Sequence, residues 1–183
     1  MIKRLENPNK PAYRELKNFI LGRDIPWMWI ESNVGNTSDN PNTNFGLYTH
    51  SLLNRPDDGS KYVFSKKNSP YTDNAWAAIS EILDYNNIFP RVLYRLCVNC
   101  SHPTETGEAS NIHTDHDYPH TNMLIYLTDT NGGDTFVEGE PFPGKEDDVI
   151  LFEGRHNHKP PKSGRRIVIV ATMLFLDNDL NRE

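Results

Sequence analysis

Four of the seven histidines in this 183-residue chain lie in two short clusters. The first cluster contains His113, Asp115 and His116, and the second contains His156 and His158. Side chains two residues apart on a strand point to the same face, so His113 and Asp115 can bind one ion side by side. Two histidines and one carboxylate form the facial triad of non-haem Fe(II) oxygenases, which leaves one side of the metal open. The sequence therefore predicts a metal centre whose third ligand comes from the second cluster.

Two arginines follow the second histidine cluster across the turn-forming residues 160–164 (PPKSG). The two flanking segments are typical of an antiparallel hairpin, with a histidine on one arm and an arginine on the other. A guanidinium binds a carboxylate in a two-point contact, which suits a dicarboxylate held between metal and arginine. Period-two alternation places Arg166 with Val168 and Arg165 with Ile167, so Arg166 is the anion-binding residue if its face is the inner one.

The elements that must position these residues change in type along the chain. Two amphipathic helices and a short aromatic strand are predicted in the first half, and apolar strands separated by turn signals in the second half. This order favours an antiparallel sandwich or barrel, mainly β, with helices packed on one face. We expect one domain over residues 1–183, with helical support and a substrate loop in 1–90 and a β core in 91–176. The predicted helices are 11–21 and 72–85, the strands are 25–30, 92–98, 122–128, 148–152 and 166–176, and the loop is 31–60.

Composition excludes several classes of protein. The chain has 19 basic and 25 acidic residues, and the resulting charge of −6 weakly disfavours nucleic acid as a partner. No apolar stretch is long enough for a transmembrane helix and the first residues lack the core of a signal peptide, so we expect no membrane partner and a cytoplasmic location. Cys97 and Cys100 have an odd spacing, which sends them to opposite faces of a strand and disfavours a zinc site with His102.

The second half, residues 90–176, resembles the double-stranded β-helix oxygenases that depend on Fe(II) and 2-oxoglutarate. This fold has a jelly-roll, cupin-like core, and the similarity is to the prolyl-4-hydroxylase-like group. The first half is loosely similar to short viral and phage members. The matching segments, in family order, are His113-Thr114-Asp115, residues 123–136 (MLIYLTDTNGGDTF), residues 147–154 (DDVILFEG), the histidine cluster and residues 163–170 (SGRRIVIV).

The resemblance implies Fe(II), 2-oxoglutarate as co-substrate, and O₂, with ascorbate as an assay additive. Arg166, or Arg165 as the alternative, binds the remote carboxylate of 2-oxoglutarate, and Tyr126 is either a second contact to it or a core tyrosine. The implied reaction hydroxylates an unactivated C–H bond and releases succinate and CO₂. The carboxylate of Asp115 disfavours a halogenase, and loss of His113 or Asp115 is expected to abolish turnover with the fold intact.

Two other functions are compatible with these residues. One is a non-catalytic module that binds metal and 2-oxoglutarate in the same fold. The other is a zinc hydrolase, which Arg166 and the lack of an evident general base disfavour. The substrate is open between a peptide or protein side chain and a small molecule, and His116 and Tyr118 are the candidates for lining its mouth.

The third metal ligand is either His158 or His156. Family spacing places it six residues after the strand-ending Phe152, which gives His158. Spacing to Arg166 favours His156 instead, since family members commonly place the arginine at least nine residues after the histidine. We favour His158 because the link before it crosses between two sheets and has little slack, whereas hairpin loops vary readily in length.

Overall fold

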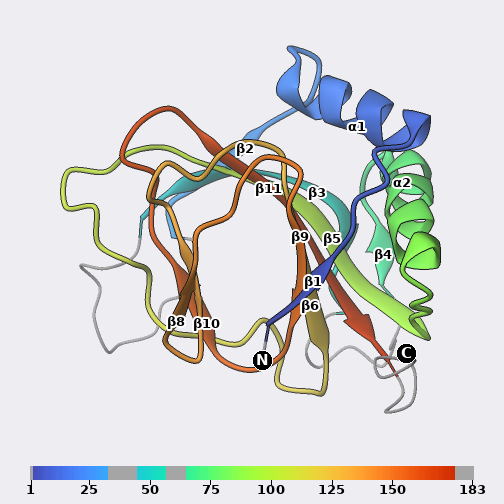
Figure 1. Cartoon of the computed structure of the whole chain (residues 1–183). Coiled ribbons are helices and arrows are strands. Elements are labelled where there is room, and N and C mark those ends of the chain that lie inside the picture. Colours follow the sequence, from blue (N-terminus) through green and yellow to red (C-terminus); the bar gives the residue numbers. More distant parts are fainter. Residues whose placement is uncertain (1, 33–44, 57–64, 176–183) are drawn as a thin grey trace.

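A computed structural model describes residues 2–32, 45–56 and 65–175 of the chain. Within these residues the strands form two antiparallel sheets that face each other (Figure 1). The larger has the order β1-β9-β6-β11-β5-β3-β2, with β4 paired to β3, and the smaller has the order β10-β7-β8. The bounds are β1 Ile2–Leu5, α1 Pro11–Leu21, β2 Met28–Ile30, β3 Leu47–Asn54, β4 Lys66–Lys67, α2 Thr72–Tyr85, β5 Val92–Ser101, β6 Thr121–Tyr126, β7 Thr135–Val137, β8 Glu140–Phe142, β9 Val149–Phe152, β10 His156–His158 and β11 Arg166–Leu174.

Alternation along the strands of the large sheet separates two hydrophobic layers. In β11, Ile167 and Ile169 belong to the layer that includes the helices, whereas Val168 and Val170 belong to the layer between the sheets. The same period of two places Cys100 in the outer layer and Cys97 in the inner one, as their odd spacing predicted. Each strand therefore presents one face to the helices and the other to the interior between the sheets.

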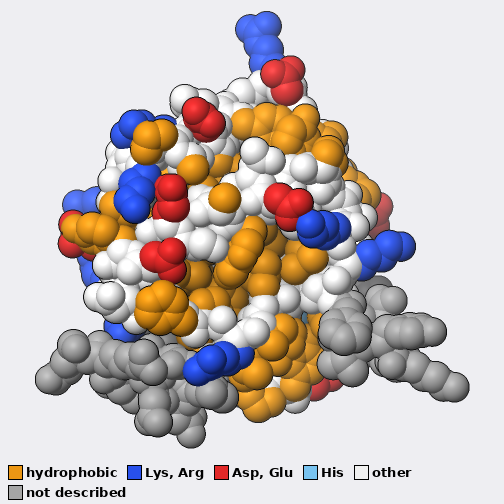
Figure 2. Space-filling model, turned by 90° about the vertical axis from the view of Figure 1, so that its right-hand side faces the viewer, with side chains coloured by type: hydrophobic (Ala, Val, Ile, Leu, Met, Phe, Trp, Pro, Cys, Tyr) orange, Lys and Arg blue, Asp and Glu red, His pale blue; other side chains and the backbone are white. Residues whose placement is uncertain are grey.

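Both helices lie on one side of the large sheet (Figure 1). Their bounds equal the predicted ranges, with Pro11 in the first turn of α1 and Gly22 at its C-terminal end. On this side hydrophobic side chains gather in the middle of the view, among Lys, Arg, Asp and Glu (Figure 2). Neither described helix has the length and apolar character needed to cross a membrane. A mainly β jelly-roll core with helices packed on one face is confirmed.

The first half of the chain contributes more to the sheet than the sequence indicated. Strands β1, β2, β3 and β4 all come from residues before 90, and β1 pairs with β9 at the far end of the sequence. The predicted loop at 31–60 was wrong over β3, and its segments 33–44 and 57–64 lie outside the described residues. Strand β3 forms although its sequence is partly polar, because it pairs with β5 and buries Leu47, Leu52 and Leu53.

Candidate metal centre

A single backbone pairing brings the two histidine clusters together. The amide of His113 donates to the carbonyl of His156 at 2.9 Å, and the amide of His156 donates to the carbonyl of His113 at 2.9 Å. Residues exchanging both bonds lie directly opposite each other, so their side chains leave the backbone at the same level. Their ring centroids are 4.4 Å apart. The carboxylate two residues after His113 completes the group.

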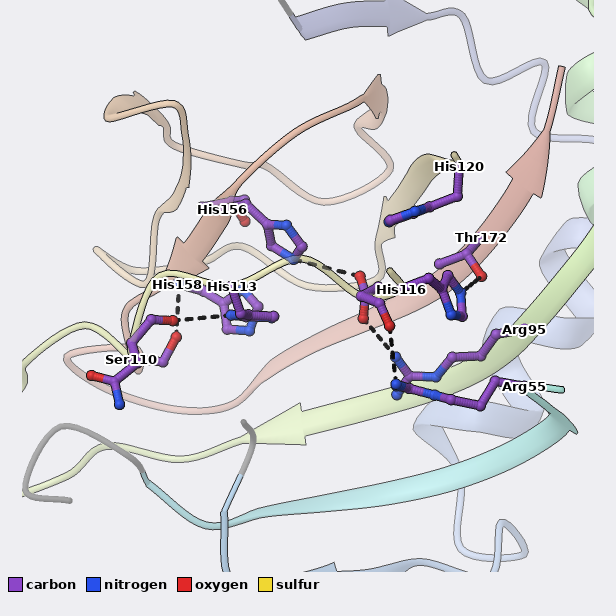
Figure 3. Close-up of polar contacts among 12 residues, drawn as sticks. Arg55, Arg95, Ser110, His113, His116, His120, His156, His158 and Thr172 are labelled. Atoms are coloured by element: carbon purple, nitrogen blue, oxygen red, sulfur yellow. Dashed lines mark hydrogen bonds and ion pairs between the residues drawn. The ribbon is translucent and has the colours of Figure 1, made fainter. Parts of the chain in front are cut away.

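The donor atoms of His113, Asp115 and His156 all lie within 4.8 Å of one another (Figure 3). His156 Nε2 is 3.5 Å from Asp115 Oδ2. His113 Nδ1 is 3.0 Å from the carbonyl of Asn111, a contact that leaves Nε2 of the ring available as a ligand. Two imidazoles and one carboxylate converging in this way fit a divalent ion of the Fe(II) or Zn(II) type.

The structure brings the alternative histidine, His156, into this group, rather than the preferred His158. The crossover from Phe152 needs only three residues, because Gly154 has φ +89° and the amide of Arg155 donates to Oε1 of Glu138 at 2.6 Å. A side chain on Gly154 would collide with Glu138. The chain therefore reaches the level of His113 two residues earlier than the family spacing suggested. His158 lies one strand repeat further on, a displacement of roughly 6.6 Å.

Two arginines hold Asp115 in place. Arg95 Nη1 contacts Asp115 Oδ1 at 2.9 Å, and Arg55 Nη1 donates to the backbone carbonyl of Asp115 at 3.0 Å (Figure 3). Burial on its own would raise the pKa of this carboxyl, but Arg95, followed by His156 and His113, holds the pKa well below its usual range. The carboxylate is therefore ionised and oriented before any ion binds, with Oδ2 turned toward His156.

Burial keeps His156 in the protonation state that binds metals. It lowers the pKa of this imidazole to about 4, although Asp115 acts in the opposite direction. The side chain is only 4% exposed. At neutral pH the ring is uncharged, and a neutral imidazole is the form that coordinates an ion.

Arg166 lines the same pocket as the three converging residues. It is 4% exposed, and its Nε donates to the carbonyl of Gly133 at 2.9 Å and its Nη2 to Thr135 Oγ1 at 2.8 Å. A larger residue would not fit at position 133, because a Cβ on Gly133 would lie 3.0 Å from Cδ of Arg166. Among the described residues no carboxylate forms an ion pair with Arg166. A buried cation with neutral partners is a site for an anion.

This chain matches known proteins in its fold but not in its sequence. No protein-family model and no curated protein matches the sequence. A solved oxidoreductase of the 2OG-Fe(II) oxygenase family from Burkholderia pseudomallei has a TM-score of 0.64 at 15% identity, covering 94% of this chain and 84% of that chain. This chain has the fold of the 2OG-Fe(II) oxygenases.

Two prolyl hydroxylases share this oxygenase fold. The viral collagen prolyl hydroxylase of Paramecium Bursaria Chlorella virus-1 has a TM-score of 0.53 at 15% identity, covering 96% of each chain. A prolyl hydroxylase from Trichoplax adhaerens, solved with a peptide fragment of hypoxia inducible factor, has a TM-score of 0.57 at 13% identity, covering 100% of this chain and 87% of that chain. The resemblance to this group is thus confirmed at the level of the fold.

Tyr126 and Arg165 are the two other residues predicted as candidates for binding 2-oxoglutarate, and neither lines the pocket of Arg166. Tyr126 is fully buried, its hydroxyl lies 2.8 Å from Thr135 Oγ1, and its ring centroid is 5.5 Å from Cζ of Arg166. Tyr126 is not among the residues that line the pocket, so it supports Arg166 from the side. Arg165, the alternative to Arg166, is exposed because it lies on the opposite face of the hairpin.

The candidates for the substrate mouth lie on the other side of Asp115. His116 Nε2 contacts Thr172 Oγ1 at 2.7 Å (Figure 3), and its ring stacks on Tyr118 with centroids 4.6 Å apart. Burial, followed by the charge of His120, lowers the pKa of His116 to about 4. His116, Tyr118 and His120 line a second, open hollow, separate from the pocket of Arg166.

Arg55 and Arg95 were missed by the sequence reasoning. Arg95 had a usable signal, since it stands in the apolar run 92–98 and shares the inner face with Cys97 by alternation. A charged side chain on the inner face of a core strand requires a partner, and Asp115 is that partner. Arg55 gave no such signal in the sequence, because only the tertiary fold brings residue 55 close to residue 115.

Proposed function

We propose that this protein is an Fe(II)- and 2-oxoglutarate-dependent oxygenase that hydroxylates an unactivated C–H bond. One observation carries the proposal: a His–Asp–His group lines the same pocket as a buried arginine that has no anionic partner among the described residues. A dicarboxylate with a metal-chelating end and a free carboxylate matches both requirements at once. The fold shared with 2OG-Fe(II) oxygenases supports the same assignment.

Each residue has a role in this proposal. His113, Asp115 and His156 hold Fe(II), and Arg166 binds the remote carboxylate of 2-oxoglutarate. Fe(II) held there would activate O₂, the oxidant: two of the four electrons it takes up would come from 2-oxoglutarate, which is oxidised to succinate and CO₂, and two from the C–H bond that is hydroxylated. Arg95 fixes the Asp115 carboxylate through Oδ1. The surrounding apolar layer, which includes Val168 and Val170, keeps bulk water from the pocket.

A prolyl residue in a peptide is the first substrate to test. Two of the structural neighbours are prolyl hydroxylases, and one of them was solved with a peptide fragment. Other protein side chains and small molecules form the second group to be screened. The open hollow around His116 and Tyr118 is the proposed approach for such a substrate, since Thr114 and His116, the chain neighbours of Asp115, both line it.

The decisive experiment measures succinate formed from 2-oxoglutarate by protein supplied with Fe(II), ascorbate and O₂, without added substrate. We expect slow uncoupled turnover that the His113→Ala variant abolishes and that the Arg165→Ala control leaves unchanged. Tight 2-oxoglutarate binding to the metal-loaded protein with no succinate would indicate a non-catalytic module instead. Absence of both binding and turnover would refute the proposal, and metal analysis after anaerobic purification would then test for zinc.

A further inference from the structure

The proposed ligands leave one histidine of the second cluster without a role. His158 lines the same pocket as the His–Asp–His group and Arg166. Both backbone polar groups of His158 are hydrogen-bonded to Ser110. The carbonyl accepts from the amide of Ser110 at 2.9 Å, and the amide donates to Ser110 Oγ at 3.3 Å. These hydrogen bonds to Ser110 fix the backbone of His158 beside the pocket.

The ring of His158 lies beside two of the proposed metal ligands. Its centroid is 5.6 Å from that of His113, with the rings nearly perpendicular at 88°, and 5.8 Å from that of His156. Arg166 lines the same pocket.

One nitrogen of the ring, Nδ1 of His158, is buried and has no hydrogen-bond partner among the described residues. Leaving a buried polar atom unpaired is destabilising, so such an atom on a pocket-lining residue points to a ligand group that completes it. Its neighbour Arg166 requires an anion at the same end of the pocket.

We propose that His158 is a second binding residue for the remote carboxylate of 2-oxoglutarate, to which its Nδ1–H donates a hydrogen bond beside Arg166. This inference rests on the proposed function. Arg166 supplies the charge, and the imidazole adds a directed hydrogen-bond donor. The paired histidines of the second cluster thus divide their work, with His156 on the metal and His158 on the co-substrate.

Calorimetric titration of 2-oxoglutarate into the Mn(II)-loaded protein tests this assignment. The variant His158→Phe keeps a planar ring and removes the donor, and we expect it to weaken 2-oxoglutarate binding about ten- to hundredfold. Its affinity for Mn(II) should stay within about threefold of wild type. His158→Asn places an amide N–H near the position of Nδ1 and should restore most of the affinity, whereas His158→Gln should restore less.

A second titrant locates the hydrogen bond. 2-Oxobutyrate keeps the metal-chelating end of 2-oxoglutarate and lacks the remote carboxylate. We expect His158→Phe to bind 2-oxobutyrate as wild type does. An equal loss for both titrants would overturn the assignment, because the bond would then be to the chelating end.

Other outcomes separate this inference from the proposed function. Unchanged 2-oxoglutarate affinity in a folded His158→Phe protein would refute the role of His158 and leave the function standing. Loss of Mn(II) binding in His158→Phe, with binding retained in His156→Ala, would make His158 the metal ligand and refute the assignment. Failure of wild-type Mn(II)-loaded protein to bind 2-oxoglutarate would refute the function itself.

Discussion

The two ends of the pocket differ in how their charges are balanced. At one end the carboxylate of Asp115 is surrounded by Arg95, Arg55 and two histidines. At the other end the guanidinium of Arg166 donates to a carbonyl and a hydroxyl, and no carboxylate among the described residues pairs with it. The first end is complete before an ion arrives, whereas the second requires an anion to balance a buried charge. In the proposed oxygenase, the metal ligands would thus be positioned before the ion binds, whereas the charge of Arg166 would be balanced only when the co-substrate binds.

The largest expected effect concerns the third metal ligand. His156→Ala should lower Mn(II) affinity by more than about a hundredfold, since it removes a direct ligand rather than a supporting contact. His102→Ala is the matched control, because His102 is exposed and lies outside the group. Calorimetric Mn(II) titration gives both values. Wild-type affinity in His156→Ala would contradict the His113–Asp115–His156 assignment.

The second largest effect is a loss of folding stability when Asp115 is replaced. Asp115→Ala leaves the part-buried Arg95 without its carboxylate partner and should lower the free energy of unfolding of the metal-free protein by about 2–3 kcal/mol. This changes the expectation from sequence that the fold would be unaffected. Asp73→Ala removes a well-exposed ion pair with Lys67 and should cost less than about 1 kcal/mol. Urea denaturation compares the two, and equal losses would contradict the proposed role of Arg95.

Replacement of Arg166 should affect ligand binding more than stability. Arg166→Ala removes a charged contact and should weaken 2-oxoglutarate binding about ten- to hundredfold, with Mn(II) affinity unchanged. Because this guanidinium has no carboxylate partner among the described residues, the loss in unfolding free energy should be smaller than for Asp115→Ala. Arg165→Ala is the control in the same titrations. Weaker binding in Arg165→Ala alone would transfer the role to that residue.

The smallest effect is a dependence of stability on pH. His116 and His156 have folded pKa values of about 4, below their usual 6.5, so the unfolded chain binds protons more readily. Their contribution is fully present above pH 6.5 and is lost as the pH falls toward 4. The free energy of unfolding of the metal-free protein should fall by about 1 kcal/mol between pH 7 and pH 6. Urea titrations at each pH measure this slope, which should be shallower in His116→Leu.

Local patterns predicted the elements whose own sequence decides their structure. Both helices were predicted with their observed bounds, and alternation correctly put Arg166 and Arg165 on opposite faces. The preference for His158 over His156 depended on the path between two sheets. That path is set by the left-handed Gly154 and its neighbour Glu138, and spacing counted along the chain does not contain it.

Contacts between distant segments were the least predictable part of the site. Strand β3 has a partly polar sequence and is stabilised by its pairing with β5, and Arg55, just after its end, reaches Asp115 only in the assembled fold. The position of Tyr126 beside Arg166, rather than in the pocket, likewise depends on Thr135 from another strand. The sequence identified the residue types that carry the chemistry, and the tertiary structure decided which of the histidines and arginines come together.

The pairing of β1 with β9 has a consequence for self-association. Residues Ile2–Leu5 lie along the outer edge of β9, the strand that leads through Gly154 to His156. Without β1, the β9 edge would present unpaired amide and carbonyl groups, which can serve as a template for strands of other molecules. Strand β1 is the edge of the sheet in its place, and a four-residue strand that carries Lys3 and Arg4 is a poorer template for edge-to-edge aggregation than the apolar β9.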